Sequence, residues 1–454
     1  MRGAMRWLCL LALAGLAASG SAITHRSPFA DLAGRAQDLD PEFAANALLR
    51  IADAPAVAAD VAWRREILDD AFQLAAGAQE PFARRNWTGY PATRFDKAYA
   101  QGLDTLTLES KAVRAMLSID YKKARELFEE IPPPQIPRLN CQDAMAYDVS
   151  IFYETVADVA ARAFSPKEVA DDEPFHLLQR YAASVDSPAE VAPVARMLMG
   201  TSLKPALYEA LVNSFAGALA QLSGDDRSFS ATVPNGAAQA IADLLADCAH
   251  RRVNAAPLAD AWRAYLRRQL GGARCADSAT RGDDLLPGGD VKAASADGVA
   301  QIAGACESPQ CQQLASQLIS LLFVSQKGSD EWAGKLRQYL AALADWKGDD
   351  HPEESFQFKS STYEDLLNET PAGPLHDLLL SSLLAWLEQT DYRGGHRVEW
   401  FYAVNKLIVH AFADRAANAA TVRELRRSED PVISLYADLE LMLPRAKEEI
   451  IRLL

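Results

Sequence analysis

Apolar residues recur every three or four positions through most of this chain, and that spacing predicts amphipathic helices. The clearest example is Leu106–Ile131, where one apolar stripe precedes a tight turn and a second stripe follows it. Two helices this short are marginal in water unless their apolar stripes pack on neighbouring elements. The pattern therefore predicts a helical hairpin that stacks against further hairpins.

Several helix starts are marked by a capping residue placed directly before a proline, which lacks the N–H that the first helical position does not need. The five dipeptides of this kind are Asp40-Pro41, Ser165-Pro166, Ser187-Pro188, Ser308-Pro309 and Asp430-Pro431. After Ser165 and Ser187, a glutamate at the third helical position completes the pattern of a capping box. These signals indicate a chain that begins one helix after another.

The sequence predicts helices along most of the chain. The helices that we predict cover 41–53, 57–77, 94–118, 120–131, 142–163, 174–185, 188–199, 202–222, 236–250, 256–270, 309–326, 329–346, 360–368, 374–390, 396–414, 418–427, 431–442 and 445–453. No run of alternating β-branched residues is typical of a sheet, so we expect an all-α protein. Short turns between neighbours favour antiparallel hairpins stacked as a solenoid, and a closed α/α toroid is the alternative.

The hairpin at Leu106–Ile131 also carries part of a known repeat pattern. Its small and aromatic positions are Ala112, Ala115, Ala124 and Phe128. At these positions the hairpin resembles a tetratricopeptide-type helical repeat. Lys111, Ile131 and Pro137 depart from that pattern, and no fixed period near ~34 residues carries it along the chain. The resemblance implies a helical-repeat architecture and a binding role, and it supplies no functional residues.

Residues 1–22 have the pattern of a secretory signal peptide. Arg2 and Arg6 precede an apolar run, and small residues lead to a cleavage position after Ala22. The apolar run is shorter than the ~20 residues that a membrane-spanning helix needs, which disfavours the alternative of a retained anchor. No later run approaches that length. We therefore expect an exported protein, periplasmic or extracellular, with no membrane span after signal removal.

Two breaks divide the rest of the chain. Prolines between Ile131 and Pro137 end an N-terminal helical block at 23–137, and a middle helical block follows at 138–270. A segment rich in Gly, Ala, Ser and Asp forms a loop insertion at 271–305, before a C-terminal helical block at 306–454. A continuous solenoid with one insertion predicts the same breaks.

The formal net charge of −15 argues against negatively charged partners. An acidic chain repels nucleic acid and anionic membrane, so neither is expected to bind. A protein or peptide partner remains, and the sequence leaves the oligomeric state open.

Five cysteines follow the signal segment, and in an oxidising compartment they are disulfide candidates. They are Cys141, Cys248, Cys275, Cys306 and Cys311. We expect a bridge from Cys275 to Cys306 or Cys311, because it would clamp the base of the 271–305 loop. A zinc site of cysteines needs closer pairs than the C-x4-C spacing here, so no metal and no cofactor are expected.

The most suggestive polar cluster contains Asp391, His396 and Glu399. A helix starting near His396 would place His396 and Glu399 one turn apart, a spacing that suits an acid/base pair. His410 is about 21 Å further up that helix, so one ion cannot bind all three. The alternative is structural: His396 caps the helix, Glu399 is solvated and Trp400 packs in the core.

The sequence predicts an exported helical-repeat protein that binds a protein or peptide and needs no catalytic residues. The alternative is an α/α-toroid enzyme acting on polysaccharide, which requires two opposed carboxylates in a cleft. Asp391 and Glu399 are the pair that we nominate for that role. Contact between the first and last hairpins favours the toroid, whereas separated ends favour the solenoid.

Overall fold

The computed structural model describes most of the chain. The described residues are 28–86, 94–140, 143, 145–229, 236–270, 306–324, 327–348, 352–416 and 418–446. Within these ranges the chain forms 21 α-helices and one two-stranded sheet, which confirms the all-α prediction. Residues 1–22 and the predicted loop at 271–305 lie outside the described ranges. Among the described residues, no helix combines the length and the apolar character needed to cross a bilayer.

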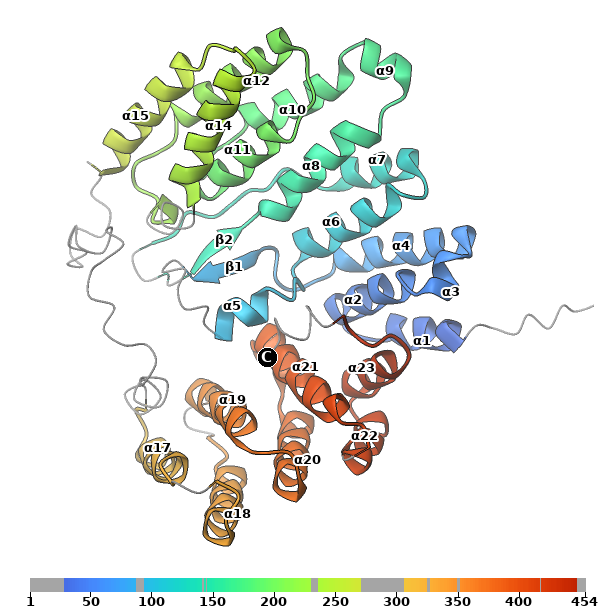
Figure 1. Ribbon diagram of the computed structural model, residues 1–454, viewed down its shortest axis with the longest axis vertical. Coiled ribbons are helices and arrows are strands. Elements are labelled where there is room, and N and C mark those ends of the chain that lie inside the picture. Colours follow the sequence, from blue (N-terminus) through green and yellow to red (C-terminus); the bar gives the residue numbers. More distant parts are fainter. Residues whose placement is uncertain are drawn as a thin grey trace, which may run out of the picture.

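The first half of the chain builds what we call the N-terminal stack (Figure 1). Its helices are α1 (Pro28–Gln37), α2 (Pro41–Ala52), α3 (Pro55–Ala58), α4 (Val61–Ala75), α5 (Arg94–Tyr99), α6 (Thr105–Met116), α7 (Tyr121–Glu130), α8 (Ser150–Arg162), α9 (Pro166–Ala170), α10 (Glu173–Ala183), α11 (Val191–Met199), α12 (Pro205–Leu219), α14 (Ala238–His250) and α15 (Ala256–Leu270). Alternate helices pack on one another, from α2 on α4 through α6 on α8 to α12 on α15. This order is that of stacked hairpins.

The second half builds the C-terminal stack. Its helices are α17 (Pro309–Leu322), α18 (Asp330–Asp345), α19 (Pro352–Glu369), α20 (Pro374–Gln389), α21 (Arg397–Ala413), α22 (Ala419–Arg426) and α23 (Pro431–Met442). Again alternate helices are in contact: α17 packs on α19, α18 on α20 and α21 on α23. Two short 3₁₀ turns, at Pro188–Glu190 and Tyr392–Gly394, precede helices in the two stacks.

The two stacks meet at the helices that begin and end the chain. Helix α23 packs on α1 and α2, and α21 packs on α5. Arg35 of α1 forms an ion pair with Asp438 of α23 at 2.7 Å. The hydroxyl of Tyr436 donates a hydrogen bond to the carbonyl of Phe43 at 2.9 Å. One cluster of buried apolar side chains consequently runs through both stacks.

Contact between the first and last helices is the observation that we expected to favour a toroid. Here the contact joins two stacks end to end in the middle of the array. The outer ends of the array, α15 and α17, lie well apart in Figure 1. In space the array therefore runs from α15 down to α1, across to α23 and on to α17, and it is stacked rather than ring-shaped.

The hairpin that the apolar pattern predicted is present as α6 and α7. Asp104 and Asp120 cap the two helices by accepting from the backbone N–H of Thr107 at 2.9 Å and of Lys123 at 3.0 Å. Phe128 is buried on the face of α7 that packs toward α8. The sequence predicts this hairpin correctly because a local apolar period and two capping residues determine it.

The predicted helix at 94–118 is wrong in one respect, because the chain breaks between α5 and α6. Gly102 has a φ of +65° there, a left-handed conformation that side chains rarely adopt. A Cβ at Gly102 would also lie 2.5 Å from Thr107. The glycine therefore permits the turn that ends α5.

The predicted helix at 142–163 is wrong in its first residues, because a short strand precedes α8 there. Strands β1 (Ala83–Asn86) and β2 (Met145–Asp148) pair antiparallel, with Ala83 opposite Asp148. The guanidinium of Arg84 lies over the ring of Tyr147, and Arg85 pairs with Asp148. Because each strand has only four residues, neither shows an alternating pattern in the sequence.

Further differences concern helix boundaries. Helices α1 and α9 were not predicted. The predicted helix at 57–77 is split into α3 and α4. Residues 445 and 446 of the predicted helix at 445–453 are not helical, and the remainder lies outside the described residues.

Four of the five predicted caps form, and the fifth has another use. Ser165 and Ser187 make capping boxes, while Ser308 and Asp430 accept from backbone N–H groups of their helices. The side chain of Asp40 makes no capping bond. The Asp40 carboxylate instead pairs with Arg393 at 3.1 Å and Arg397 at 3.0 Å, and so contributes to the junction of the stacks.

The expected bridge to Cys275 requires correction. Cys306 and Cys311 form a disulfide with each other across the start of α17, with Cα atoms 5.3 Å apart. The turn capped by Ser308 brings the two cysteines together. Cys275 lies outside the described residues, and Cys248 is a buried free thiol whose pKa is raised by burial.

Candidate functional site

The three residues nominated for catalysis are held by three different elements. Asp391 is exposed and accepts from the backbone N–H of Arg393 at 3.1 Å, which caps the 3₁₀ turn. His396 precedes α21, and its ring stacks on Phe356 of α19 with centroids 4.1 Å apart. Glu399 is only 9% exposed, and its charge acts on Arg94 of α5.

The structural interpretation is confirmed for Trp400, which is fully buried, and it is wrong for Glu399. The structural alternative made Glu399 a solvated residue, whereas it is buried. His396 occupies the capping position of α21, but its side chain makes no capping bond. His410 lies near His376 of α20, with ring centroids 5.6 Å apart, and burial lowers its pKa to about 4. Glu399, His396 and His410 therefore each contact a different part of the fold.

A buried polar cluster that the sequence did not reveal lies beside Glu399. Glu364 of α19 forms ion pairs with Lys406 at 3.4 Å and Lys97 at 3.7 Å, and it accepts from the hydroxyl of Tyr402 at 3.0 Å. Lys406 is 2% exposed, and burial lowers its pKa, while Glu364 opposes that shift. These residues come from α5, α19 and α21. The cluster therefore holds α5 against the C-terminal stack.

Its companion, Arg94, makes the same connection. The guanidinium of Arg94 donates to the carbonyl of Gln357 at 3.0 Å and to the hydroxyl of Ser361 at 2.7 Å. Burial lowers the pKa of Arg94, and the nearby carboxylates of Glu364 and Glu399 oppose that shift. No sequence signal links α5 to residues some 260 positions away, since the contact arises only from the fold.

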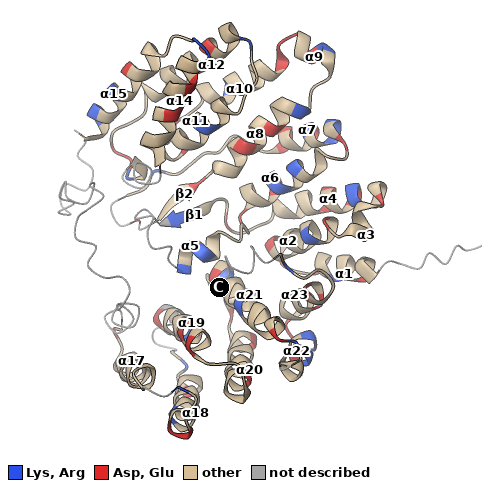
Figure 2. Ribbon diagram, in the orientation of Figure 1, with Lys and Arg blue, Asp and Glu red and all other residues tan. Residues whose placement is uncertain are grey.

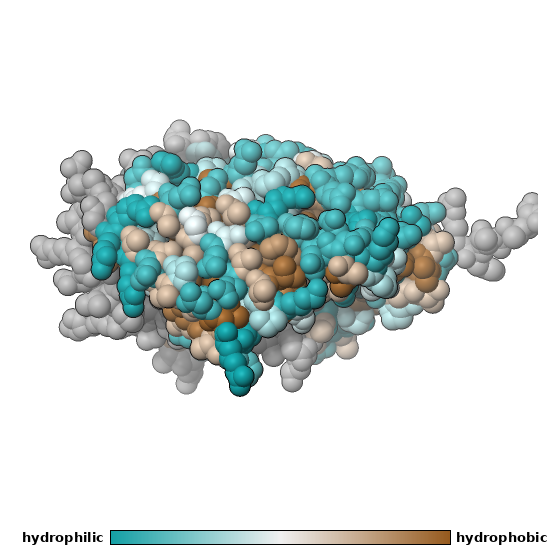
Figure 3. Space-filling view, turned by 90° about the horizontal axis from the view of Figure 1, so that it is seen from above, coloured by the Kyte–Doolittle hydropathy of each residue, from teal (hydrophilic) through white to brown (hydrophobic). Residues whose placement is uncertain are grey.

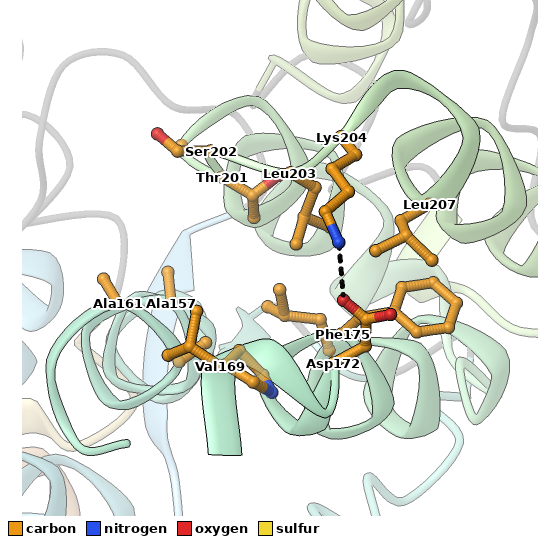
Figure 4. Close-up of a pocket in the computed structure, with 14 residues that line it drawn as sticks. Ala157, Ala161, Val169, Asp172, Phe175, Thr201, Ser202, Leu203, Lys204 and Leu207 are labelled. Carbon is orange, nitrogen blue, oxygen red and sulfur yellow. Dashed lines mark hydrogen bonds and ion pairs between the residues drawn. The ribbon is translucent and has the colours of Figure 1, made fainter. Parts of the chain in front are cut away.

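A different feature has the shape of a binding site. A cavity of about 320 Å³ opens between α8, α9, α10 and the segment leading into α12 (Figure 4). We call it the apolar pocket. Its lining is Ala157, Ala160, Ala161, Val169, Asp172, Pro174, Phe175, Leu178, Gly200, Thr201, Ser202, Leu203, Lys204 and Leu207. The volume falls in the range of pockets that accept small groups.

The walls of the apolar pocket are hydrophobic, and its mouth is charged. Phe175 and Leu207 face the cavity in Figure 4, and Val169 is 51% exposed. Lys204 pairs with Asp172 across the mouth at 3.4 Å. The Thr201 hydroxyl already donates to a backbone carbonyl at 2.8 Å. Such a pocket suits an apolar group, because its walls lose contact with water when it is filled.

No pattern in the sequence predicts the apolar pocket. Val169 belongs to α9. This helix has five residues, which are too few to show an apolar period in the sequence. Figure 3 views the molecule from above and shows apolar patches scattered within a mainly hydrophilic surface. The pocket thus exists only once neighbouring hairpins have stacked.

Comparisons with known proteins give no family. No protein-family model, no curated protein and no solved structure matches this chain.

Proposed function

We propose that this chain is an exported helical-repeat protein that binds a protein partner, and that the partner inserts an apolar side chain into the apolar pocket. The observation that carries the proposal is that pocket, with hydrophobic walls and a half-exposed Val169 at its opening. Stacked hairpins present extended surfaces on which such pockets serve as anchor points.

The tetratricopeptide likeness belongs to the same proposal. The hairpin α6–α7 keeps Ala124 and Phe128 buried at the repeat spacing, as that family would require. Alternate-helix packing through both stacks supports divergent repeats of this general kind. Because the repeat pattern covers one hairpin, the proposal takes only architecture and binding from the likeness.

Export is proposed from two observations. The first 22 residues have the pattern of a signal peptide. The disulfide between Cys306 and Cys311 supports an oxidising compartment, because such bonds are rare where thiols are kept reduced. Both observations favour a periplasmic or extracellular location. Recovery of the chain from its native cell with Met1 intact would contradict this part.

The alternative, a polysaccharide-active toroid enzyme, receives less support. Its nominated carboxylates are occupied elsewhere: Asp391 caps a turn, and Glu399 is buried against α5. Replacing Glu399 by Gln tests the alternative directly. Carbohydrate turnover that survives this change would remove Glu399 from the nomination.

The partner can be sought with the tagged mature protein and an extract of its own cell envelope. Proteins retained on the tag would be identified by mass spectrometry, and each purified protein would then be tested for stoichiometric rebinding. We expect one protein to rebind saturably. Retention of glycans alone, or of nothing, would contradict the proposal and favour a screen for polysaccharide turnover.

A further inference from the structure

The apolar pocket opens between two polar rims that differ in chemistry (Figure 4). One rim is the turn from α9 into α10, where Asp171, Asp172 and Glu173 follow one another. The other rim is the segment 201–204, which leads into α12. The Lys204 ammonium pairs with the Asp172 carboxylate across the mouth at 3.4 Å. The two rims therefore lie close together, and a group that enters the pocket passes between them.

The acidic rim keeps negative charge after Asp172 has paired. Asp171 and Glu173 are exposed, and neither forms an ion pair with another described residue. The nearest cation along the chain is Lys167 of α9, which is also exposed and balances at most one of these two charges. Figure 2 shows acidic residues beside α9. Negative charge at the rim of a binding site favours a positively charged partner, because it speeds association and discriminates between partners.

The opposite rim offers main-chain groups. Residues 201–204 belong to no helix or strand, and Lys204 has extended dihedral angles, with φ −59° and ψ 144°. Ser202 and Lys204 are exposed, whereas Leu203 between them is half-buried. In the described part of the chain, the backbone N–H groups of Ser202 and Leu203 have no hydrogen-bond acceptor. An extended chain beside this segment would supply carbonyl acceptors for them.

These main-chain groups favour an extended partner over a helical one. A helix uses its own N–H and C=O groups within the helix, so its interior has none to offer. An extended segment keeps these groups free and points successive side chains to opposite sides. Such a segment can bond to the 201–204 rim while one of its side chains enters the pocket between Phe175 and Leu207.

We propose that the partner binds through an extended segment, in which one apolar side chain fills the apolar pocket and a neighbouring lysine or arginine pairs with Asp171 or Glu173. This inference rests on the proposed function, since it uses the same pocket, and it adds the chemistry of the segment that the partner presents. The buried side chain supplies affinity, because its apolar surface leaves water. The cation and the main-chain bonds to Ser202 and Leu203 select the partner.

A library of short random peptides displayed on phage tests this chemistry. The library is selected in parallel against the mature protein and against Val169→Glu, which places a carboxylate at the pocket mouth. Peptides enriched only on the unchanged protein are those that use the pocket. We expect these peptides to combine a large apolar residue with a nearby lysine or arginine.

The most enriched peptide is then synthesised and titrated by calorimetry. Combining Asp171→Asn with Glu173→Gln should weaken its binding by about fivefold at low salt, and high salt should remove most of that difference. The matched control combines Asp330→Asn with Glu331→Gln, which removes two exposed carboxylates from α18 in the C-terminal stack. This control should bind the peptide as the unchanged protein does.

Two further readouts follow the main chain. Binding of the peptide should slow amide hydrogen exchange at Ser202 and Leu203, and transferred nuclear Overhauser effects should show an extended bound peptide. A helical bound peptide, or equal affinity of the acidic-rim variant and the α18 control, would overturn this inference and leave partner binding at the pocket standing. If no peptide distinguishes the unchanged protein from Val169→Glu, both this inference and the proposed use of the pocket fail.

Discussion

Arg397, at the start of α21, donates a hydrogen bond to Glu42 of α2 at 2.8 Å, and so joins a helix near the end of the chain to one near its beginning. Arg397 also pairs with Asp40 at 3.0 Å. Glu42 is 2% exposed, and Arg397 is its ion-pair partner. The junction of the two stacks therefore combines these ion pairs with a continuous core of buried apolar side chains.

Replacing Arg397 by Met should therefore destabilise the protein by about 3 kcal/mol, because Glu42 would remain buried without its cation. Chemical denaturation measures the loss of unfolding free energy. The control is Arg423→Met, which removes an exposed arginine of α22. Equal stability of the two variants would contradict the role assigned to Arg397.

Glu109 of α6 should make stability fall as the pH rises. Its carboxyl is buried, and burial followed by the charges of Glu130 and Asp104 raises its pKa to about 7. The raised pKa favours the protonated form in the folded state, so its contribution is present at low pH and is lost as pH rises from about 4.5 through 7. Glu109→Gln should therefore stabilise at pH 8, by on the order of 1 kcal/mol after allowance for solvent, and have little effect at pH 4.

Denaturation curves at the two pH values measure this difference. Glu126→Gln is the control, because Glu126 is exposed on the neighbouring helix α7. A gain for Glu109→Gln that is the same at both pH values would show that the gain does not come from the titration of Glu109.

His410 should have the opposite effect in acid. Burial, followed by the positive charges of Lys406 and His376, lowers its pKa to about 4, while Glu364 opposes the shift. The folded state therefore holds the ring neutral. Its contribution is complete above pH 6.5 and is lost as the pH falls toward 4. His410→Gln should flatten the loss of stability between these values, by on the order of 1 kcal/mol.

Thermal unfolding across this pH range tests the effect. His250→Gln provides the comparison, since His250 is exposed at the end of α14. An unchanged acid profile in His410→Gln would exclude His410 as a source of acid sensitivity.

The features that the sequence predicted are those decided within a few residues. The α6–α7 hairpin follows from a local apolar period and from caps such as Asp120. The same reasoning found Ser165 as the cap of a helix start. Asp40 shows the limit of that reasoning, because its side chain binds Arg397 rather than capping α2.

The candidate sites lay beyond sequence reasoning because they depend on distant contacts. Ala83 pairs with Asp148 across 65 positions, and neither strand is long enough to show a period. Arg50 and Arg445, at opposite ends of the chain, both form ion pairs with Glu440. The apolar pocket unites Val169 with Leu207 only after α9 and α12 have both packed on α10. Periodicity predicts the helices, but it does not identify which helices meet.

The most direct test of the central claim compares two valine variants for binding of the captured partner, by titration calorimetry with purified proteins. Val169→Glu places a carboxylate at the mouth of the apolar pocket, where Val169 is 51% exposed. Val61→Glu is the matched control, because Val61 is 58% exposed at the start of α4 and away from the pocket. We predict that Val169→Glu weakens binding by about tenfold or more, or about 1.4 kcal/mol, while Val61→Glu binds as the unchanged protein does. Equal affinity of both variants and the unchanged protein would contradict partner binding at this pocket.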